Sequence, residues 1–227
     1  MRAGLSPARA WKAFHVLLTV FVTFRKRERF LFLRPLSPQA LKQAILDLGV
    51  CFIKLAQVLA TRADFFSAEY LRELKTIHDE VAPMPRRDFE VMFRRAFGET
   101  PPFTSFDDEP MASASIGQVH RATLANGTEL AVKLRRRGIT RRVQHDLRLL
   151  RLLLALFKPF FSPYTKNSLE AVIAEFSAML IKEVDLALEL ENLRKFTDTY
   201  RDSGVRFPEY YPELSSQDVL IMSFEPG

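Results

Sequence analysis

The sequence predicts an α+β protein with a helical part over residues 1–100 and a mixed part over residues 101–227. Apolar residues before residue 62 recur at alternating spacings of four and three, as in a helix with one buried face. Asn126-Gly127 separates two runs rich in β-forming residues, which indicates a hairpin. A short apolar run at Val219–Phe224 predicts a further strand. Helices therefore dominate the first part, and strands enter after residue 100.

The composition is that of a folded protein, because 48% of the 227 residues are hydrophobic and 26% are charged. Cys51 is the single cysteine, which excludes a disulfide and a cysteine-rich zinc site within this chain. The net charge of +6 favours an anionic partner. It does not choose between a nucleotide, a nucleic acid and an acidic membrane face.

The longest apolar run, Ala13–Phe24, is followed directly by the basic cluster Arg25-Lys26-Arg27. The run is shorter than the roughly 20 residues that a membrane-spanning helix needs, so no transmembrane span is expected in this chain. Two possibilities stay open. The run could form an interfacial helix with its basic end near anionic head groups, or a helix packed on the protein itself.

One long helix is expected from Ser37 to Arg62, with Ser37 as its cap and Pro38 in its first turn. Lys54 and Gln57 lie three residues apart on this helix and share a face away from the apolar stripe. Periodicity alone therefore makes both of them solvated surface residues.

Two shorter helices are expected next. The first covers Ser67–His78, with Ser67 as its cap. The second covers Arg86–Phe97 and is closed by Gly98. These helices complete the part of the chain that precedes the strands.

The stretch Pro110–Arg137 predicts two strands joined by a two-residue turn at Asn126-Gly127, in which both turn residues have positive φ. The second strand carries Ala131-Val132-Lys133. A lysine in that position, downstream of a loop of small residues, is the arrangement with which a kinase holds nucleotide phosphates. An ordinary hairpin with a solvated Lys133 is the alternative.

The rest of the chain predicts two helices and two strands. Ile139–Phe157 is the first helix, and a long helix follows from Asn167 or Ser168 to about Tyr200. A short or edge strand is expected at Val205–Glu209, because it contains a proline, ahead of the apolar strand near the end.

The long helix carries an acidic series made of Glu183, Asp185, Glu189 and Glu191. Asp185 and Glu189 are four residues apart and would lie on one face of it. A charged face exposed to solvent explains this spacing equally well.

Three stretches of the chain carry signatures that occur in a fixed order. Phe52–Gln57 has the sequence FIKLAQ, Ala112–His120 has the sequence ASASIGQVH, and Glu183-Val184-Asp185 places two acids around one apolar residue. Together they resemble the UbiB/AarF family of atypical kinases, the protein-kinase-like proteins of ubiquinone biosynthesis. The first resembles the family's KxGQ signature with Ala56 in place of glycine. The second resembles its alanine-rich loop with Ser113 where alanine is usual, and the third matches its ExD signature.

This resemblance implies a protein-kinase-like small lobe, made of an antiparallel sheet and a long helix and preceded by a helical extension. Lys133 would bind the phosphates of ATP or ADP and pair with Glu189, by analogy with the lysine–glutamate pair of kinases. The loop would cover the nucleotide. Its residues are Ala112, Ser113, Ala114, Ser115, Ile116, Gly117 and Gln118.

The resemblance also implies a gate. Lys54 and Gln57 would fold back from the extension over the nucleotide cleft and meet Glu183 or Asp185. Such a lock would keep out a large protein substrate, which favours ATP hydrolysis or a small or lipid-like target.

Kinase chemistry further needs a catalytic-loop Asp, an Asn for metal and an Asp-Phe-Gly-type metal ligand, all after the strand that leads into the hinge. That strand is expected at Val219–Phe224, so the large lobe is absent from these residues. Asp47-Leu48-Gly49 and Asp202-Ser203-Gly204 lie in the wrong places to serve. We therefore expect a truncated family member with no catalytic residue and no metal ligand of its own, which needs the missing lobe to bind Mg²⁺.

The leading expectation is the nucleotide-binding portion of a UbiB-type kinase or ATPase that supports ubiquinone biosynthesis. Such a protein would be cytoplasmic and peripheral at the inner membrane, with quinone-biosynthesis proteins or lipid as partners. A non-catalytic regulatory or binding module is the alternative. Arg135-Arg136-Arg137 and Arg141-Arg142 suggest a nucleic-acid-binding protein. No nucleic-acid partner is expected, however, because no known module is present and aromatic residues are not interleaved with the basic run.

Overall fold

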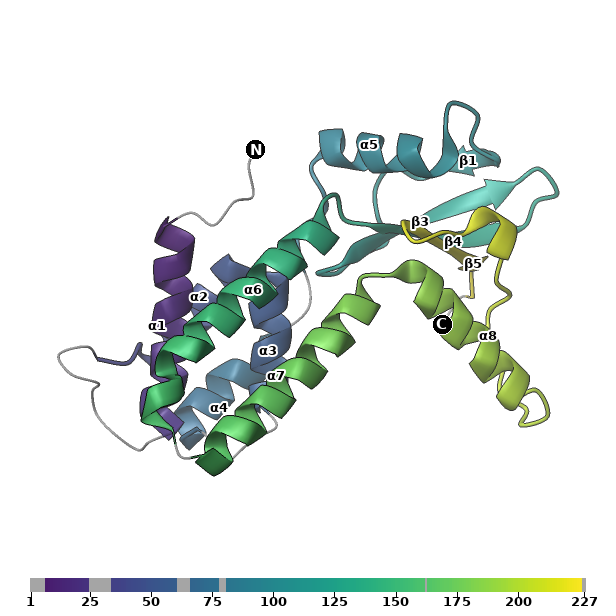
Figure 1. Ribbon diagram of the computed structural model, residues 1–227. Helices are drawn as coiled ribbons and strands as arrows, with labels where there is room; N and C mark the ends of the chain where they lie inside the picture. The colour runs from purple at the N-terminus through teal and green to yellow at the C-terminus, as the bar shows by residue number, and fades with distance from the viewer. Residues whose placement is uncertain (1–6, 25–33, 61–65, 78–80, 162, 226–227) are drawn as a thin grey trace. The chain divides into compact units, whose positions relative to one another are not determined.

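The computed structural model describes residues 7–24, 34–60, 66–77, 81–161 and 163–225. They form two compact units whose segments alternate along the chain (Figure 1). The helical unit comprises Met1–Asp79 and Thr140–Leu180, and the sheet unit comprises Glu80–Ile139 and Ile181–Gly227. The expected α+β fold with a small antiparallel sheet is confirmed. The domain boundary expected at residue 100 stays a prediction.

The helical unit holds a set of α-helices and one short 3₁₀ helix, with the start of α6 and the end of α7 belonging to the sheet unit. The elements are α1 (Pro7–Phe24), α2 (Pro38–Leu48), α3 (Val50–Ala60), α4 (Ala68–Lys75), α6 (Ile139–Phe157), η1 (Lys158–Phe160) and α7 (Pro163–Glu183). The bounds of α6 are those that the sequence predicts. Helix α7 begins at Pro163, earlier than the expected start at Asn167 or Ser168, because proline is well suited to the first turn of a helix.

The apolar run in α1 packs inside the helical unit. Leu18, Phe21 and Val22 are buried and form one apolar cluster with Phe157 of α6. The rings of Phe21 and Phe157 stack with their centroids 5.2 Å apart. The packed-helix possibility for Ala13–Phe24 is therefore confirmed, and contact of α1 with a membrane surface stays a prediction. No helix in the described part of the chain is long and apolar enough to cross a membrane.

A buried ion pair joins the same two helices. Arg9 of α1 donates from Nη2 to Oδ2 of Asp146 in α6 over 2.6 Å, and also to the carbonyl oxygen of Leu48 over 2.6 Å. The side chain of Asp146 is only 4% exposed. Burial raises the pKa of Asp146 although the Arg9 guanidinium opposes that shift. A charged group thus lies at a junction of α1, α2 and α6.

The expected long helix Ser37–Arg62 is two helices, because Gly49 interrupts it. Gly49 has a φ of 81°, a left-handed conformation that favours glycine. Its N–H donates to the carbonyl oxygens of Ile45 and Leu46 and closes α2, and α3 begins at the next residue. Ser37 caps α2 as predicted, since its side chain accepts a hydrogen bond from the N–H of Ala40. Arg62 lies outside the described residues.

The helix expected at Ser67–His78 is shorter than predicted. Helix α4 ends at Lys75, and His78 lies outside the described residues. Ser67 occupies the N-cap position with an extended backbone, but its side chain makes no capping hydrogen bond. The expected side-chain cap is therefore wrong, although the start of the helix is correct.

The sheet unit contains the whole described sheet together with two α-helices. Its elements are α5 (Arg86–Phe97), β1 (Phe103–Phe106), β2 (Ala112–Ser113), β3 (Gly117–Leu124), β4 (Glu129–Arg135), α8 (Leu186–Thr199), η2 (Pro212–Leu214) and β5 (Val219–Ser223). The strand order is β1-β3-β4-β5, all antiparallel, with β2 paired to the edge of β3. Strand β1 was not predicted.

Side-chain alternation along β4 gives the sheet two different faces. Leu130, Val132 and Leu134 are buried in a cluster with Phe89 of α5. Lys133, one residue out of phase, points to the opposite face, where α8 lies (Figure 1). The sheet therefore presents an apolar face to α5 and places a lysine on the side of α8.

The β3–β4 hairpin is where the sequence predicts it, but its turn is longer. The N–H of Gly127 donates to the carbonyl oxygen of Leu124 over 2.9 Å, and the N–H of Leu124 donates to Thr128 over 3.0 Å. Gly127 has a φ of 84°. A turn followed by a left-handed glycine is the usual three-residue hairpin loop. The expected two-residue turn is therefore wrong, because three residues lie between Leu124 and Thr128, whose hydrogen bond closes the loop.

Two further expectations for the end of the chain need correction. The long helix expected to reach Tyr200 breaks at Val184, because Asp185 adopts an extended backbone and caps a new helix, α8. Val205–Glu209 is not a strand. Near that segment Tyr210 forms one isolated bridge with Met222 of β5, since Pro208 and Pro212 limit further pairing.

Candidate functional site

Lys133 and Glu189 lie in contact within the sheet unit. Lys133 Nζ donates to Oε1 of Glu189 over 2.7 Å and to Oε2 over 2.8 Å. The two side chains are 25% and 42% exposed, so a ligand in solution can still reach them. Exposed ion pairs contribute about 0–1 kcal/mol to stability, so stability alone gives little reason for this geometry. The structure thus brings together the two residues that the family resemblance pairs, and Lys133 is not simply solvated.

The loop of small residues folds as a tight hairpin on the edge of the sheet. Ala112 pairs with Val119, Ser113 pairs with Gln118, and the N–H of Ala114 donates to the carbonyl oxygen of Gly117 over 2.8 Å. A Cβ on Gly117 would lie 2.7 Å from the carbonyl oxygen of Leu134 in β4. Only glycine fits there, and the end of the loop is held directly against the strand that carries Lys133.

Arg136 braces this loop from the end of β4. Its Nε donates to the carbonyl oxygen of Ala114 over 2.8 Å, and its Nη2 donates to Ser113 Oγ over 2.8 Å and to the carbonyl oxygen of Ala82 over 2.7 Å. Its backbone N–H donates to Ile116 over 2.8 Å. Sequence reasoning missed this residue by grouping it with the basic run. Its position just after the lysine strand, next to the antiparallel loop, was the available signal.

The predicted loop residues differ in how accessible they are. Ala112 and Ala114 are exposed, whereas Ser115 and Ile116 are buried. The hydroxyl of Ser115 has no hydrogen-bond partner within the part of the chain that the structure describes. A ligand that approaches the loop from solvent would therefore contact Ala112 and Ala114 first.

Gln118 belongs to a buried polar network rather than to the loop surface. Its Oε1 accepts from the N–H of Met84 over 2.8 Å, and its Nε2 lies 2.7 Å from Nε2 of His120. His120 Nδ1 lies 2.7 Å from the carbonyl oxygen of Asp107. This set is complete when His120 is neutral with its proton on Nδ1. Burial lowers the pKa of His120, which agrees with that neutral form.

The acidic signature Glu183-Val184-Asp185 is fixed to the sheet by Arg135. Arg135 Nη1 donates to the carbonyl oxygen of Val184 over 2.8 Å, and its Nη2 forms an ion pair with buried Asp218. Asp185 Oδ1 accepts from the N–H of Ala187 over 3.1 Å as the cap of α8. Glu183 is half-buried. One carboxylate of the signature thus serves helix α8.

The predicted gate involves residues from both units. Lys54 and Gln57 are half-buried on α3 of the helical unit, next to the buried Ala56. Glu183 and Asp185 belong to the sheet unit. The gating contact between the two pairs stays a prediction.

The three arginines at the end of β4 and directly after it make contacts within the sheet unit. Arg135 and Arg136 make the contacts given above, and Arg137 Nη1 lies 2.9 Å from Oδ1 of Asp88 in α5. Contacts within the protein therefore account for Arg135, Arg136 and Arg137, whereas Arg141 and Arg142, the other part of the basic feature, are exposed. The absence of a nucleic-acid partner stays a prediction. No group of three or more His, Cys, Asp or Glu side chains among residues 7–24, 34–60, 66–77, 81–161 and 163–225 is placed to hold a metal ion.

Comparison with known proteins places this geometry in a family. The model of the ABC1 atypical kinase-like domain matches residues 76–227. The chain belongs to this family. The matched region contains Lys133, Glu189, the braced loop and Arg136, whereas Lys54 and Gln57 precede it. The resemblance seen in the sequence is therefore confirmed.

Individual relatives agree with the family match. The chain is 33% identical over 190 residues to the Arabidopsis thaliana protein ACTIVITY OF BC1 COMPLEX KINASE 7, chloroplastic, covering 82% of this chain and 27% of that protein. It is 30% identical over 185 residues to a probable protein kinase UbiB of Marinobacter nauticus, covering 80% and 34%. The chain thus spans about a third of the length of these ABC1 relatives.

A solved structure is also similar. It is the Mycobacterium tuberculosis protein Rv3197 in complex with erythromycin, with a TM-score of 0.55 and 29% identity. The similarity covers 77% of this chain and 43% of that one. The described residues of this chain form helices and a small antiparallel sheet, as the similarity to the Rv3197 structure indicates, and they form no large lobe.

Proposed function

We propose that the sheet unit binds ATP or ADP and is the nucleotide-binding portion of an ABC1-type atypical kinase or ATPase. The observation that carries this proposal is the contact of Lys133 with both carboxylate oxygens of Glu189. An ammonium group has three donors, so Lys133 can hold Glu189 and still offer a donor to a phosphate oxygen. Glu189 keeps the ammonium in place, as in the lysine–glutamate pair of kinases.

The braced loop supports the same proposal. Arg136 and the close approach at Gly117 hold the loop in one conformation before any ligand arrives. A preformed loop loses little conformational freedom on binding, which favours affinity. The exposed alanines offer little side-chain bulk, so the adenosine phosphates can approach the backbone closely.

The wider role is also part of this proposal. The family resemblance supports a function in ubiquinone biosynthesis, with quinone-biosynthesis proteins or lipid as partners at the cytoplasmic side of the inner membrane. The gate of Lys54 and Gln57 with Glu183 and Asp185 would then limit the target to a small or lipid-like molecule. Mg²⁺ would bind through residues of the large lobe, because the described residues offer no cluster for it.

Nucleotide binding can be tested by calorimetric titration of the chain with ATP and with ADP. Replacing Lys133 by Ala should weaken binding about tenfold or more, since a hydrogen bond to a charged group is worth about 1.5–3 kcal/mol. Lys195→Ala is the matched control, because Lys195 also pairs with a glutamate of α8, Glu191, over 2.6 Å. Equal affinity of the Lys133→Ala variant and the unchanged chain would refute the proposal.

The same samples test turnover. We expect these 227 residues to bind ATP without hydrolysing it, because neither Asp47-Leu48-Gly49 nor Asp202-Ser203-Gly204 lies where a kinase holds its metal ligand. ATP hydrolysis that disappears in the Lys133→Ala variant would show that a catalytic site exists within these residues.

A further inference from the structure

Helices α6 and α7 run side by side in the helical unit (Figure 1). An open groove of about 360 Å³ lies between them. Its walls are apolar and include Leu154 of α6, Leu169 and Ile173 of α7, and Phe161 between the helices. Pockets that hold small ligands have volumes of roughly 300–1,000 Å³ and mostly apolar walls with a few polar groups. The groove therefore has the size and the lining of a small ligand site.

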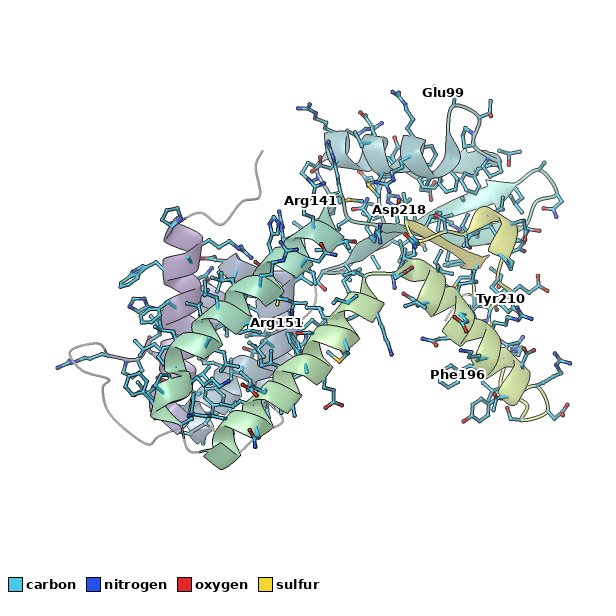
Figure 2. All side chains as sticks on the ribbon, viewed as in Figure 1. Glu99, Arg141, Arg151, Phe196, Tyr210 and Asp218 are labelled. Carbon is cyan, nitrogen blue, oxygen red and sulfur yellow. The ribbon has the colours of Figure 1, made fainter. Side chains whose placement is uncertain are left out.

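Three cations stand around these apolar walls. Arg151, which Figure 2 labels, lies on α6, Lys158 begins η1 directly after it, and Lys166 lies on α7. On each helix the groove residues recur at helical spacing, with Arg151, Leu154 and Lys158 on one stripe. Each helix thus turns one mixed cationic and apolar stripe toward the groove.

The charges of the groove do not cancel. Among the described residues that line the groove, Glu170 carries the only carboxylate, which lies 2.5 Å from Lys158 Nζ. Arg151 and Lys166 make no ion pair with any residue that the structure describes. The positive charge that remains therefore lies beside apolar walls, which a ligand with one anionic group and an apolar body would match.

We propose that the groove binds an anionic amphiphile, a molecule with one carboxylate or phosphate head group on a single apolar chain. Arg151 and Lys166 would hold the head group, and the apolar walls would take the chain. A carboxylate would come from a free fatty acid and a phosphate from a phospholipid-type head group. None of the groove residues belongs to the nucleotide site, so either proposal can be refuted without refuting the other.

The test titrates the full chain by calorimetry with dodecanoate and with dodecyl phosphate, both below their micelle-forming concentrations. Dodecyl maltoside is the uncharged probe, and inorganic phosphate is the probe without an apolar chain. Binding of one or both acids, with neither control probe binding comparably, supports the proposal, and the acid that binds more tightly identifies the source of the head group. Failure of both acids to bind, or equally tight binding of dodecyl maltoside, would overturn it.

Variants locate the binding. Arg151→Ala and Lys166→Ala should each weaken acid binding about tenfold, whereas Arg148→Ala, an exposed arginine of α6 outside the groove, should leave it unchanged. Ala174→Trp should abolish binding, because Ala174 is exposed and lines the groove, so a large ring fills it without disturbing the core. Ala178→Trp, outside the groove on α7, is its control. Unchanged binding in Ala174→Trp would overturn the proposal.

Two further measurements distinguish the groove from a membrane-binding surface and from the nucleotide site. Vesicles of phosphatidylglycerol that bind the chain while both monomeric acids do not would assign the cations to a membrane surface and overturn the groove proposal. The Lys133→Ala variant should retain acid binding, and Ala174→Trp should retain nucleotide binding. Loss of acid binding in the folded Lys133→Ala variant would contradict a site built from α6 and α7 alone.

Discussion

The two units use their positive charges differently. In the sheet unit, Arg135, Arg136 and Arg137 all bind carbonyl or carboxylate groups of the same unit. In the helical unit, Arg9 is similarly committed, but Arg151 and Lys166 make no ion pair with described residues and stand beside an apolar groove. A run of basic residues in a sequence therefore says little until their partners are known. Cations without a protein partner are better candidates for ligand binding than cations that already hold the fold together.

The largest expected effect is in the helical unit. Asp146→Ala removes the buried hydrogen-bond partner of Arg9 and should lower the free energy of unfolding by about 3 kcal/mol. Asp47→Ala is the control, because the Lys12–Asp47 pair is about 40% exposed on both sides, and should cost about 0–1 kcal/mol. Urea denaturation followed by circular dichroism measures both. Equal losses in the two variants would show that burial of the pair does not matter.

Next in size is the loop brace of the sheet unit. Arg136→Ala removes four hydrogen bonds to the loop and the segment before α5, and should cost about 2 kcal/mol of stability. It should also weaken nucleotide binding, because the loop is no longer held in one conformation. Arg137→Ala, which removes one half-exposed ion pair, should change neither by much. Nucleotide affinity that survives Arg136→Ala would separate the brace from the site.

The stability of the sheet unit should depend on pH through His120. Because burial lowers the pKa of His120, the unfolded state binds a proton that the folded state resists. Neutral His120 therefore contributes fully to the free energy of unfolding above the ordinary histidine pKa of about 6.5. This contribution is lost as the pH falls below that value, by up to about 1.4 kcal/mol per pH unit. Urea denaturation at pH 7.5 and 5.5 measures the change. His120→Phe should lose this part of the pH dependence, and an unchanged slope would assign it to other groups.

The smallest effect concerns Cys51 of the helical unit. Burial raises the pKa of its thiol to about 12, so the thiolate that reacts with alkylating reagents is scarce at neutral pH. Iodoacetamide should leave the native chain unlabelled and should label it in urea. Mass spectrometry over a urea series would then report the opening of the helical unit alone. Rapid labelling without urea would show that α3 opens in the native state.

Sequence reasoning found the elements that depend on strong local signals. The Asn126-Gly127 hairpin, the cap at Ser37 and the bounds of α6 follow from turn residues and periodicity. It missed the break at Gly49, because an isolated glycine within a helical pattern is tolerated and only the observed φ shows that it ends the helix. It also missed β1, whose pairing with β3 depends on a distant segment.

The candidate site was predictable only in part. Family resemblance rather than periodicity paired Lys133 with Glu189, since the two residues are far apart in the chain and meet on the face of the sheet where α8 lies. Arg136 was grouped with its neighbours because the three arginines have the same chemistry, and only its place just after the lysine strand, beside the antiparallel loop, distinguished it. The groove depends on how α6 and α7 pack, and no motif in the sequence marks it.

The cap of α8 joins two signatures within one helical turn. Asp185 accepts the N–H of Ala187 with its carboxylate, and its carbonyl oxygen accepts from the N–H of Glu189 over 3.4 Å. Any group that drew the Asp185 carboxylate away would cost about 1 kcal/mol of capping energy and loosen the turn on which Glu189 stands. A change in the contacts of the Asp185 carboxylate therefore also shifts Glu189, which lies one turn further along α8. Because Glu189 binds Lys133, the change extends to Lys133.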